Sequence, residues 1–218
     1  MNSFVDTNVS IAYTFSIDPL NNNSRKVFKD YENILWSNNV KKEFHKVFLA
    51  KSDSLVTFYE GLVVDIEHGN FHDFTLDNLE KHVKRNYSKD KDYNQILSSL
   101  KPFWEEYVGE YLPNYLSFKS AIEECKRDLR IKIYSKKEKW ESKILLTVER
   151  VEKYEGLKSK LDSLGVHFPD DEIVLDAHDY NLRVEDKINF ITFDRGFYDA
   201  VHQIEDFCFN KVLGKLDF

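Results

Sequence analysis

The sequence predicts an α/β protein in which a small, mostly parallel sheet is flanked by helices and a large helical insertion occupies the middle of the chain. Two short, apolar, β-prone stretches stand near the two ends, at 3–5 and 188–193, and residues that favour helix starts follow each one. Between them, apolar residues recur at the three- and four-residue steps of helices. With 7 glycines and 4 prolines, the chain has few helix-breaking positions.

The elements follow in order along the chain. After the strand at 3–5, Thr7 and Asn8 favour a helix start. Residues 33–37 read either as a strand or as the close of the amphipathic stretch before them, and both readings stay open. From Asn38 a long helix is indicated by apolar residues at helical spacing, namely Val40, Phe44, Val47, Phe48, Leu55, Tyr59, Leu62, Val63 and Ile66.

Almost all of the stretch from Phe71 to Gly165 reads as helix, with loops near 68–74, 86–92 and 111–115. Its last helix is expected to end at Gly165, a suitable C-cap, and carries Trp140, Ile144, Val148, Val151, Tyr154, Leu157, Leu161 and Leu164 on one face. Pro169 then precedes an acidic first turn, which suits the positive end of a helix dipole and predicts another helix start.

The composition excludes several classes of protein. A net charge of -7, with 32% charged residues, gives no overall basic field for holding nucleic acid, so any such surface must be local. Cys125 and Cys208 are the 2 cysteines and lie far apart, which suggests neither a disulfide framework nor a structural zinc site. The chain shows no signal-peptide pattern and no apolar run of bilayer length, so we expect a cytoplasmic protein without membrane insertion.

Four carboxylates stand in positions where charge is unusual. Asp6 and Asp194 end the two β-prone stretches, where ligands collect in open α/β sheets, although either could also serve as a helix N-cap. Glu43 and Asp170 share the apolar faces of their helices, where an uncompensated carboxylate is costly. A cluster of such groups needs protons or a metal. Oxygen ligands favour Mg²⁺ or Mn²⁺ and hence metal-assisted hydrolysis of a phosphodiester.

These segments resemble the PIN-domain nucleases, a family that includes many ribonuclease toxins of toxin-antitoxin pairs. "FVDTNV" is similar to the family's first strand and acid, "VKKEF" to its helical glutamate, "DDEIVLDA" to its third-acid helix, and "TFDRGF" to its last motif. The resemblance implies a PIN-like three-layer core and catalytic Asp6, Glu43, Asp170 and Asp194. For the third acid, the helix register favours Asp170, with Asp171 and Asp176 as competing metal ligands.

The resemblance also implies Thr192 and Asn8 as supporting residues, Mg²⁺ or Mn²⁺ as cofactor, RNA as substrate, and products with 5′-phosphate and 3′-hydroxyl ends. The stretch between Glu43 and Asp170 is far longer than a minimal family member needs. We therefore expect a discontinuous nuclease core, 1–55 and 166–218, around a helical insertion, 56–165. The long insertion leaves open whether an antitoxin-like protein partner or a homo-oligomer follows the pattern of the small toxins.

One segment of the insertion is locally basic. Residues 126–143 hold eight basic and three acidic side chains, and Arg127, Arg130, Tyr134 and Lys137 recur at helical steps that could present cations and a ring to RNA. A solvated helix face explains the same residues. Two other functions stay open: a catalytically weak PIN-like scaffold whose insertion binds RNA or a protein, and a metal-dependent phosphatase for small substrates.

Overall fold

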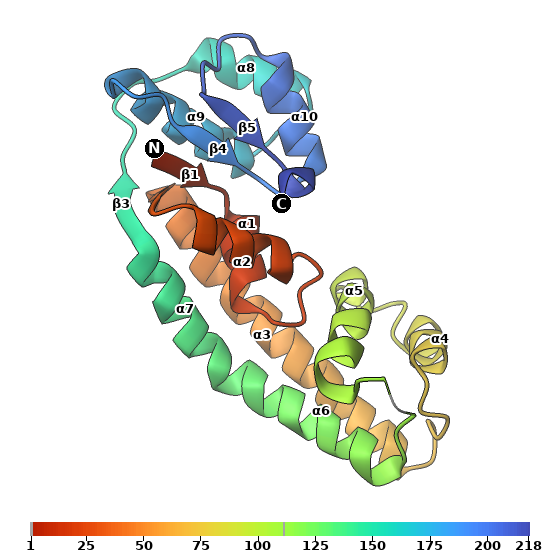
Figure 1. Cartoon of the computed structure of the whole chain (residues 1–218). Helices are drawn as coiled ribbons and strands as arrows, with labels where there is room; N and C mark the ends of the chain where they lie inside the picture. Colours follow the sequence, from red (N-terminus) through yellow and green to blue (C-terminus); the bar gives the residue numbers. More distant parts are fainter. Residues whose placement is uncertain (1, 111) are drawn as a thin grey trace.

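The computed structural model describes residues 2–110 and 112–218. The chain is 64% helical and contains a five-stranded parallel sheet, which confirms the predicted α/β class (Figure 1). In spatial order the strands are β3-β2-β1-β4-β5. Their bounds are Asn2–Val5 for β1, Asn33–Ser37 for β2, Ile144–Val148 for β3, Asn189–Ile191 for β4 and Lys211–Leu213 for β5.

The two ends of the chain meet at the centre of the sheet. Strand β1 pairs with β4, with Phe4 opposite Phe190, and the two rings stack with centroids 5.9 Å apart. The chain runs from β1 outward through β2 to β3 and then returns to β4 on the other side of β1. The strand order therefore reverses between β1 and β4. In open parallel sheets, the carboxyl ends of the strands at such a switch point form the ligand-binding crevice.

Helices cover the sheet on both sides. Figure 1 shows the C-terminal helices above it in this view and the N-terminal helices below it. The former are α8 (Glu155–Ser163), α9 (Asp170–Arg183) and α10 (Arg195–Gln203); the latter begin with α1 (Thr7–Thr14) and α2 (Asn21–Asp30). A 3-10 turn, η2 (Lys215–Asp217), follows the last strand.

The long insertion forms an arm that leaves the sheet and returns to it. Helix α3 runs outward, α6 and α7 run back beside it, and α4 and α5 pack at the far end (Figure 1). The bounds are Asn38–Glu67 for α3, Leu76–Asn86 for α4, Tyr93–Phe103 for α5, Trp104–Val108 for the π turn η1, Tyr115–Arg130 for α6 and Lys132–Lys143 for α7. Trp140 is fully buried and fixes the base of the arm, since its ring packs on Tyr13 and Phe28 at 5.1 and 6.0 Å.

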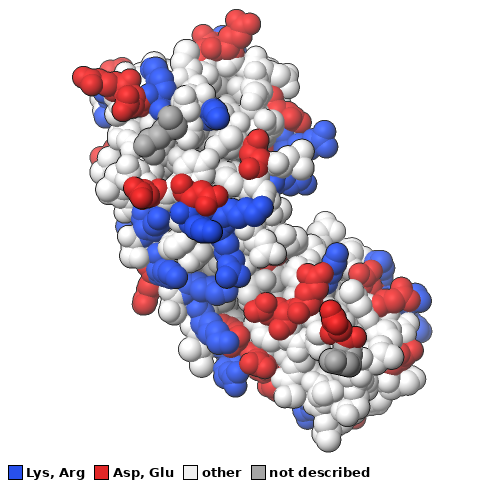
Figure 2. Space-filling view, viewed as in Figure 1, with Lys and Arg blue, Asp and Glu red and all other residues white. Residues whose placement is uncertain are grey.

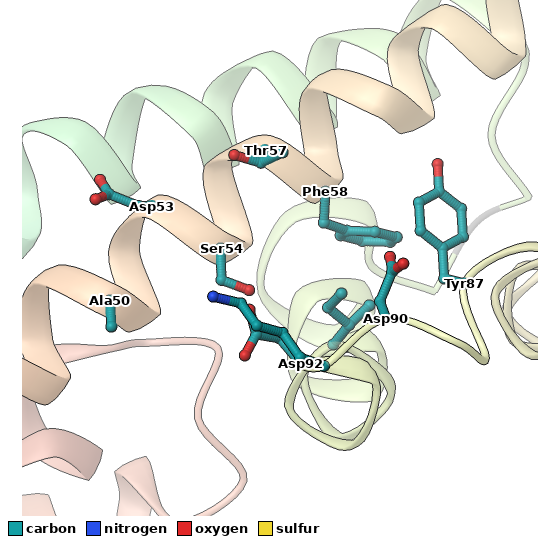
Figure 3. Close-up of a pocket in the computed structure, with 10 residues that line it drawn as sticks. Ala50, Asp53, Ser54, Thr57, Phe58, Tyr87, Asp90 and Asp92 are labelled. Carbon is teal, nitrogen blue, oxygen red and sulfur yellow. The ribbon is translucent and has the colours of Figure 1, made fainter.

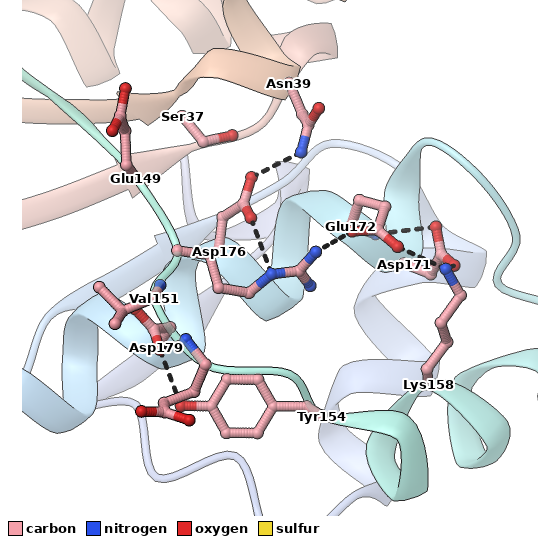
Figure 4. A network of polar contacts seen from close by, with 12 residues as sticks. Ser37, Asn39, Glu149, Val151, Tyr154, Lys158, Asp171, Glu172, Asp176 and Asp179 are labelled. Atoms are coloured by element: carbon pink, nitrogen blue, oxygen red, sulfur yellow. Dashed lines mark hydrogen bonds and ion pairs between the residues drawn. The ribbon is translucent and has the colours of Figure 1, made fainter.

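The predicted continuous helix from Trp140 to Gly165 is wrong. Ile144–Val148 forms β3, which pairs in parallel with β2, so the range 56–165 contributes a strand to the sheet. The chain after β3 is held by Asp179 of α9: its carboxylate accepts hydrogen bonds from the Val151 and Glu152 N–H groups, both at 3.1 Å (Figure 4). Helical spacing of apolar residues cannot reveal such pairing, because β2 lies about a hundred positions earlier in the chain.

Within residues 2–110 and 112–218, none of the helices combines the length and the apolar character that crossing a bilayer requires.

Candidate metal centre

Asp6 lies directly after β1, at the switch point of the sheet, and is only 2% exposed. Its Oδ1 accepts a hydrogen bond from the Thr7 backbone N–H at 2.5 Å, which makes Asp6 the N-cap of α1. Its Oδ2 accepts a hydrogen bond from the Thr192 hydroxyl at 2.8 Å. The N-cap reading and the strand-end reading of the sequence are therefore both correct for this residue.

Thr192 joins the two strand ends. Besides donating to Asp6, its hydroxyl oxygen accepts hydrogen bonds from the Asp194 N–H at 3.1 Å and from the Asn8 side-chain amide at 3.3 Å. The amide oxygen of Asn8 accepts in turn from the Phe193 N–H at 3.0 Å. The two residues that the sequence indicates as supports thus lie beside Asp6 and connect β1 to the residues after β4.

Glu43 and Asp170 reach the same point from two helices. Glu43 lies in the second turn of α3, and its Oε2 accepts a hydrogen bond from the Thr7 hydroxyl at 2.6 Å. Asp170 is the first residue of α9. One carboxylate oxygen from each of Asp6, Glu43 and Asp170 lies within 4.8 Å of the other two. We call these three residues the acid cluster.

Asp194 lies beside the acid cluster but does not belong to its three converging oxygens. It is the N-cap of α10, with Oδ1 accepting from the Phe197 N–H at 2.8 Å, and its side chain is exposed. It lines the same cleft of about 270 Å³ as the cluster residues. Its charge acts on Asp170, because it is one of the causes that raise the pKa of that residue.

The electrostatics of the acid cluster are those of uncompensated negative charge. Burial raises the pKa of Asp6 to about 8, and the Asp170 and Glu43 charges add to the rise although the Thr192 and Thr7 donors oppose it. Burial likewise raises the pKa of Asp170 to about 6, with further contributions from Glu43, Asp194 and Asp171. The cleft contains the cation of Lys51, but its Nζ lies 2.6 Å from Asp18 and is paired there.

The two other candidates for the third acid point elsewhere. Asp171 is buried and pairs with Lys158, with Oδ2 and Nζ 3.2 Å apart. Asp176 accepts a hydrogen bond from the Asn39 side chain at 2.9 Å and faces Arg150 at 3.5 Å. Figure 4 shows both residues in a network of charged groups around α9. Asp170 is therefore the aspartate of α9 that the fold brings to Asp6 and Glu43.

The four residues that the sequence suggests for RNA contact do not form one free cationic face. Arg127 and Arg130 lie in α6 and pair with Glu124 and Glu60, respectively. Tyr134 and Lys137 lie in α7; Tyr134 packs edge-on against Phe48, and Lys137 pairs with Glu141 at 3.1 Å. The interhelical turn at Ile131 and these acidic partners replace the single basic stripe that the spacing suggests.

Sequence reasoning missed three residues of the cleft. Thr7 holds Glu43, and the ion pair of Lys51 with Asp18 forms part of the wall. Lys51 had a usable signal, because it follows Glu43 and Val47 in steps of four on α3 and therefore shares their helix face. The sequence contains no signal for Thr7 beyond its position next to Asp6. Its hydroxyl group meets Glu43 because α3 packs beside α1, which is a tertiary contact.

A second hollow lies farther along the same helix. Its volume is about 490 Å³, and Figure 3 shows Ser54 and Phe58 of α3 on one wall, with Tyr87 and Asp90 on the other. Within residues 2–110 and 112–218, the ligand atoms of the acid cluster converge as a metal site requires, and this hollow contains no such group of three side chains. The chemistry of a metal centre therefore belongs to the cleft at the switch point.

The donor set of the acid cluster fits a hard divalent cation. Its three ligands are all oxygen and their charges repel one another, while burial, together with this repulsion, raises the pKa values of Asp6 and Asp170. Mg²⁺ and Mn²⁺ are bound by few carboxylates together with waters and substrate phosphates. Asp6, Glu43 and Asp170 would hold such an ion directly, with Asp194 at the rim of the cleft.

Thr192→Val is expected to weaken Mn²⁺ binding about tenfold, because the Thr192 hydroxyl orients Asp6 and supports of this kind tune metal affinity. It should also lower the free energy of unfolding by about 1–2 kcal/mol. Titration of Mn²⁺ by calorimetry measures the first effect. Thr14→Val is the matched control, since the buried Thr14 hydroxyl donates a hydrogen bond to the Ile11 carbonyl within its own helix. If this variant binds Mn²⁺ equally weakly, the role of Thr192 is not specific.

Comparison of this chain with family models, curated proteins and solved structures finds no match in any of the three.

Proposed function

We propose that this protein is a Mg²⁺- or Mn²⁺-dependent nuclease that hydrolyses phosphodiester bonds in RNA. The observation that carries the proposal is the acid cluster, in which three carboxylates from β1, α3 and α9 converge at the switch point of a parallel sheet. Function follows such a site and not the fold alone. The PIN-like arrangement indicated by the sequence supports the same reaction.

A divalent ion held by Asp6, Glu43 and Asp170 would activate water for attack at neutral pH and would offset negative charge on the substrate phosphate. The residues of the chain prepare the site for it. Thr192 and Thr7 each donate a hydrogen bond to a cluster carboxylate and so fix the direction of its oxygens. Asp194 is anchored through one oxygen to the start of α10 and extends the negative wall of the cleft toward solvent.

The paired cation in the cleft suits a substrate with a negative backbone. Lys51 lines the cleft with the acid cluster and is held by Asp18 at 2.6 Å, so the wall facing the acids is electrically mixed and not uniformly repulsive. A phosphodiester approaching the ion would meet this wall next to its scissile phosphate. RNA is the proposed substrate because the resemblance of the sequence motifs favours it over DNA.

The test is incubation of an end-labelled single-stranded RNA with purified protein in Mg²⁺, Mn²⁺ or a chelator. Metal-dependent cleavage that leaves 5′-phosphate and 3′-hydroxyl ends supports the proposal. Cleavage that persists in the chelator, or that leaves a 2′,3′-cyclic phosphate, contradicts it. A matched DNA oligonucleotide in the same assay decides whether the activity is confined to RNA.

A further inference from the structure

A second cationic surface lies on the side of α7 away from the residues that the sequence suggested. It comprises exposed or half-exposed cations of two helices, which we call the basic face: Arg25, Lys26 and Lys29 of α2, and Lys136, Lys139 and Lys143 of α7. Figure 2 shows lysine and arginine side chains gathered over the region where Figure 1 places α2 and α7. This face joins two segments that lie more than a hundred positions apart in the chain.

Phe28 brings the two sets of cations together. The Nζ atoms of Lys139 and Lys143 lie 5.4 and 5.2 Å from the centroid of the Phe28 ring, and Trp140 packs against the same ring. The cations of α7 therefore extend over α2 and do not point away from it. Lys29 follows Phe28 directly on α2.

Apart from Lys26, the cations of the basic face lack side-chain carboxylate partners among the described residues. Over residues 2–110 and 112–218, none of them forms an ion pair within 4.0 Å, whereas Lys132 and Lys137 on the same α7 helix pair with Asp128 and Glu141. Lys26 is held by a main-chain oxygen of Phe218, to which its ammonium group donates a hydrogen bond. In a chain of net charge -7, these positive charges are concentrated on one face.

The charges also act on one another. Burial lowers the pKa of Lys136, and the neighbouring Arg25 and Lys132 lower it further, although Glu106 and Asp128 oppose the shift. Like charges held this close repel, and an anion that binds across them relieves the repulsion. A surface of this kind suits a polyanion better than a single carboxylate, because the cations of α7 alone are spread over about two turns of helix, or roughly 11 Å, and those of α2 lie beside them.

The basic face is continuous with the cleft of the acid cluster. Asp18 lines that cleft and also lines a second hollow of about 240 Å³, whose other walls include Arg25 and Lys136. Asp18 thus borders both the cleft of the acid cluster and the hollow beside Arg25 and Lys136, which Pro102, Glu105 and Glu106 of the arm also line. This continuity favours a nucleic-acid strand over a membrane surface as the occupant.

We propose that the basic face binds the sugar–phosphate backbone of single-stranded RNA beside the acid cluster, without reading its sequence. The inference rests on the proposed nuclease function for its substrate, but its geometry is separate from that of the metal centre. Phosphate contacts of this kind give affinity that falls as salt rises, and they position the strand without selecting bases.

The test is the affinity of a fluorescent single-stranded RNA for protein in a chelator, measured by anisotropy over a range of salt. The triple variant Lys29→Glu, Lys139→Glu, Lys143→Glu is expected to bind about tenfold or more weakly, with the slope of log affinity against log salt reduced by about 2. The corresponding Gln triple, which removes charge without reversing it, should fall between this variant and wild type. Thermal unfolding checks that both variants fold.

A matched control carries the same change of net charge elsewhere. Lys89, Lys153 and Lys187 are exposed, and within the described residues they form no ion pair; the triple Glu variant at these sites should bind RNA within about twofold of wild type. Equal losses in the two Glu triples, or none in either, would overturn the proposal. So would a basic-face variant that loses binding to anionic vesicles while it keeps binding to RNA.

The outcomes separate this inference from the nuclease proposal. If wild type binds RNA through the basic face but never cleaves it with metal, the surface stands and the nuclease function fails. If wild type cleaves RNA and the basic-face variants bind and cleave as well as wild type, the nuclease function stands and the surface assignment fails. Where both hold, the variants should raise KM for RNA while kcat stays near the wild-type value.

Discussion

Asp6→Asn is expected to reduce Mn²⁺-dependent cleavage of RNA by roughly 10³-fold, because a metal ion stabilises the transition state of such reactions by several kcal/mol. Asp6 is the most buried member of the acid cluster, and its two carboxylate oxygens accept hydrogen bonds from the Thr7 N–H and the Thr192 hydroxyl, respectively. Asparagine keeps the shape but loses the charge. The measurement is the initial rate of cleavage at saturating Mn²⁺, compared with that of wild type.

Asp176→Asn is the matched control for this prediction. Asp176 is a buried aspartate that binds Asn39 and faces Arg150, outside the cleft. Its variant should cleave at close to the wild-type rate at a temperature where it is folded. Undiminished cleavage by folded Asp6→Asn would contradict the assignment of the metal centre. Loss of cleavage with unchanged RNA affinity in a chelator would separate catalysis from binding.

The metal-free protein is expected to lose stability as pH rises from 5 to 8, by on the order of 3 kcal/mol. The folded-state pKa of Asp6 is raised to about 8 and that of Asp170 to about 6, from a value of 3.8 in the unfolded chain. Between these limits the folded state holds more protons than the unfolded state. Unfolding therefore releases protons and becomes easier as pH rises, until both groups are ionised in both states.

One group acts in the opposite direction within this window. Burial lowers the pKa of His178 below its ordinary value of 6.5, so the unfolded state binds a proton at this residue more readily than the folded state does. His178 therefore increases the free energy of unfolding as pH rises toward 6.5. Asp176 acts in the same direction as Asp6, because burial raises its pKa as well. Five carboxylates with lowered pKa values change protonation below this window, namely Glu67, Glu141, Glu172, Asp179 and Asp206.

Urea unfolding at several pH values in a chelator measures this effect. In Asp6→Asn the free energy of unfolding should fall less between pH 5 and 8, because the variant lacks the carboxyl group with the largest pKa shift. At pH 8 this variant should be more stable than wild type by about 1–2 kcal/mol, after subtraction of the lost Thr192 hydrogen bond. Saturating Mn²⁺ should remove the fall in wild type, because the ion binds the ionised cluster. Metal-free stability that rises steadily from pH 5 to 8 would contradict the electrostatics of the site.

Local sequence features were sufficient to indicate several of the carboxylates that line the cleft. Asp6 and Asp194 stand where strands end, and Glu43 shares a helix face with Val40 and Val47; these features depend on residues close together in the chain. Helix register favoured Asp170 as the third acid but left Asp171 and Asp176 as competitors. Neighbouring helix positions differ by about 100° around the axis, and only the packing of α9 on the sheet decides which one meets Asp6.

Contacts between distant segments account for what the sequence missed. Strand β3 looked helical because its apolar residues fit helical spacing, whereas its pairing with β2 is a tertiary contact. The basic segment 126–143 was recognised, but its free cations lie on the side of α7 that faces α2. Periodicity identifies a helix face and not the neighbour of that face.

The most direct test of the acid cluster is thermal unfolding of metal-stripped wild type, Asp170→Asn and Asp171→Asn during titration with Mn²⁺. An ion bound only by the folded state at a hundred times its Kd adds about 2.7 kcal/mol, or roughly 5–10 °C for a chain of this size. We expect this rise in wild type and in Asp171→Asn, and scarcely any in Asp170→Asn. No rise in wild type, or an equal rise in all three proteins, would contradict a metal centre formed by Asp6, Glu43 and Asp170.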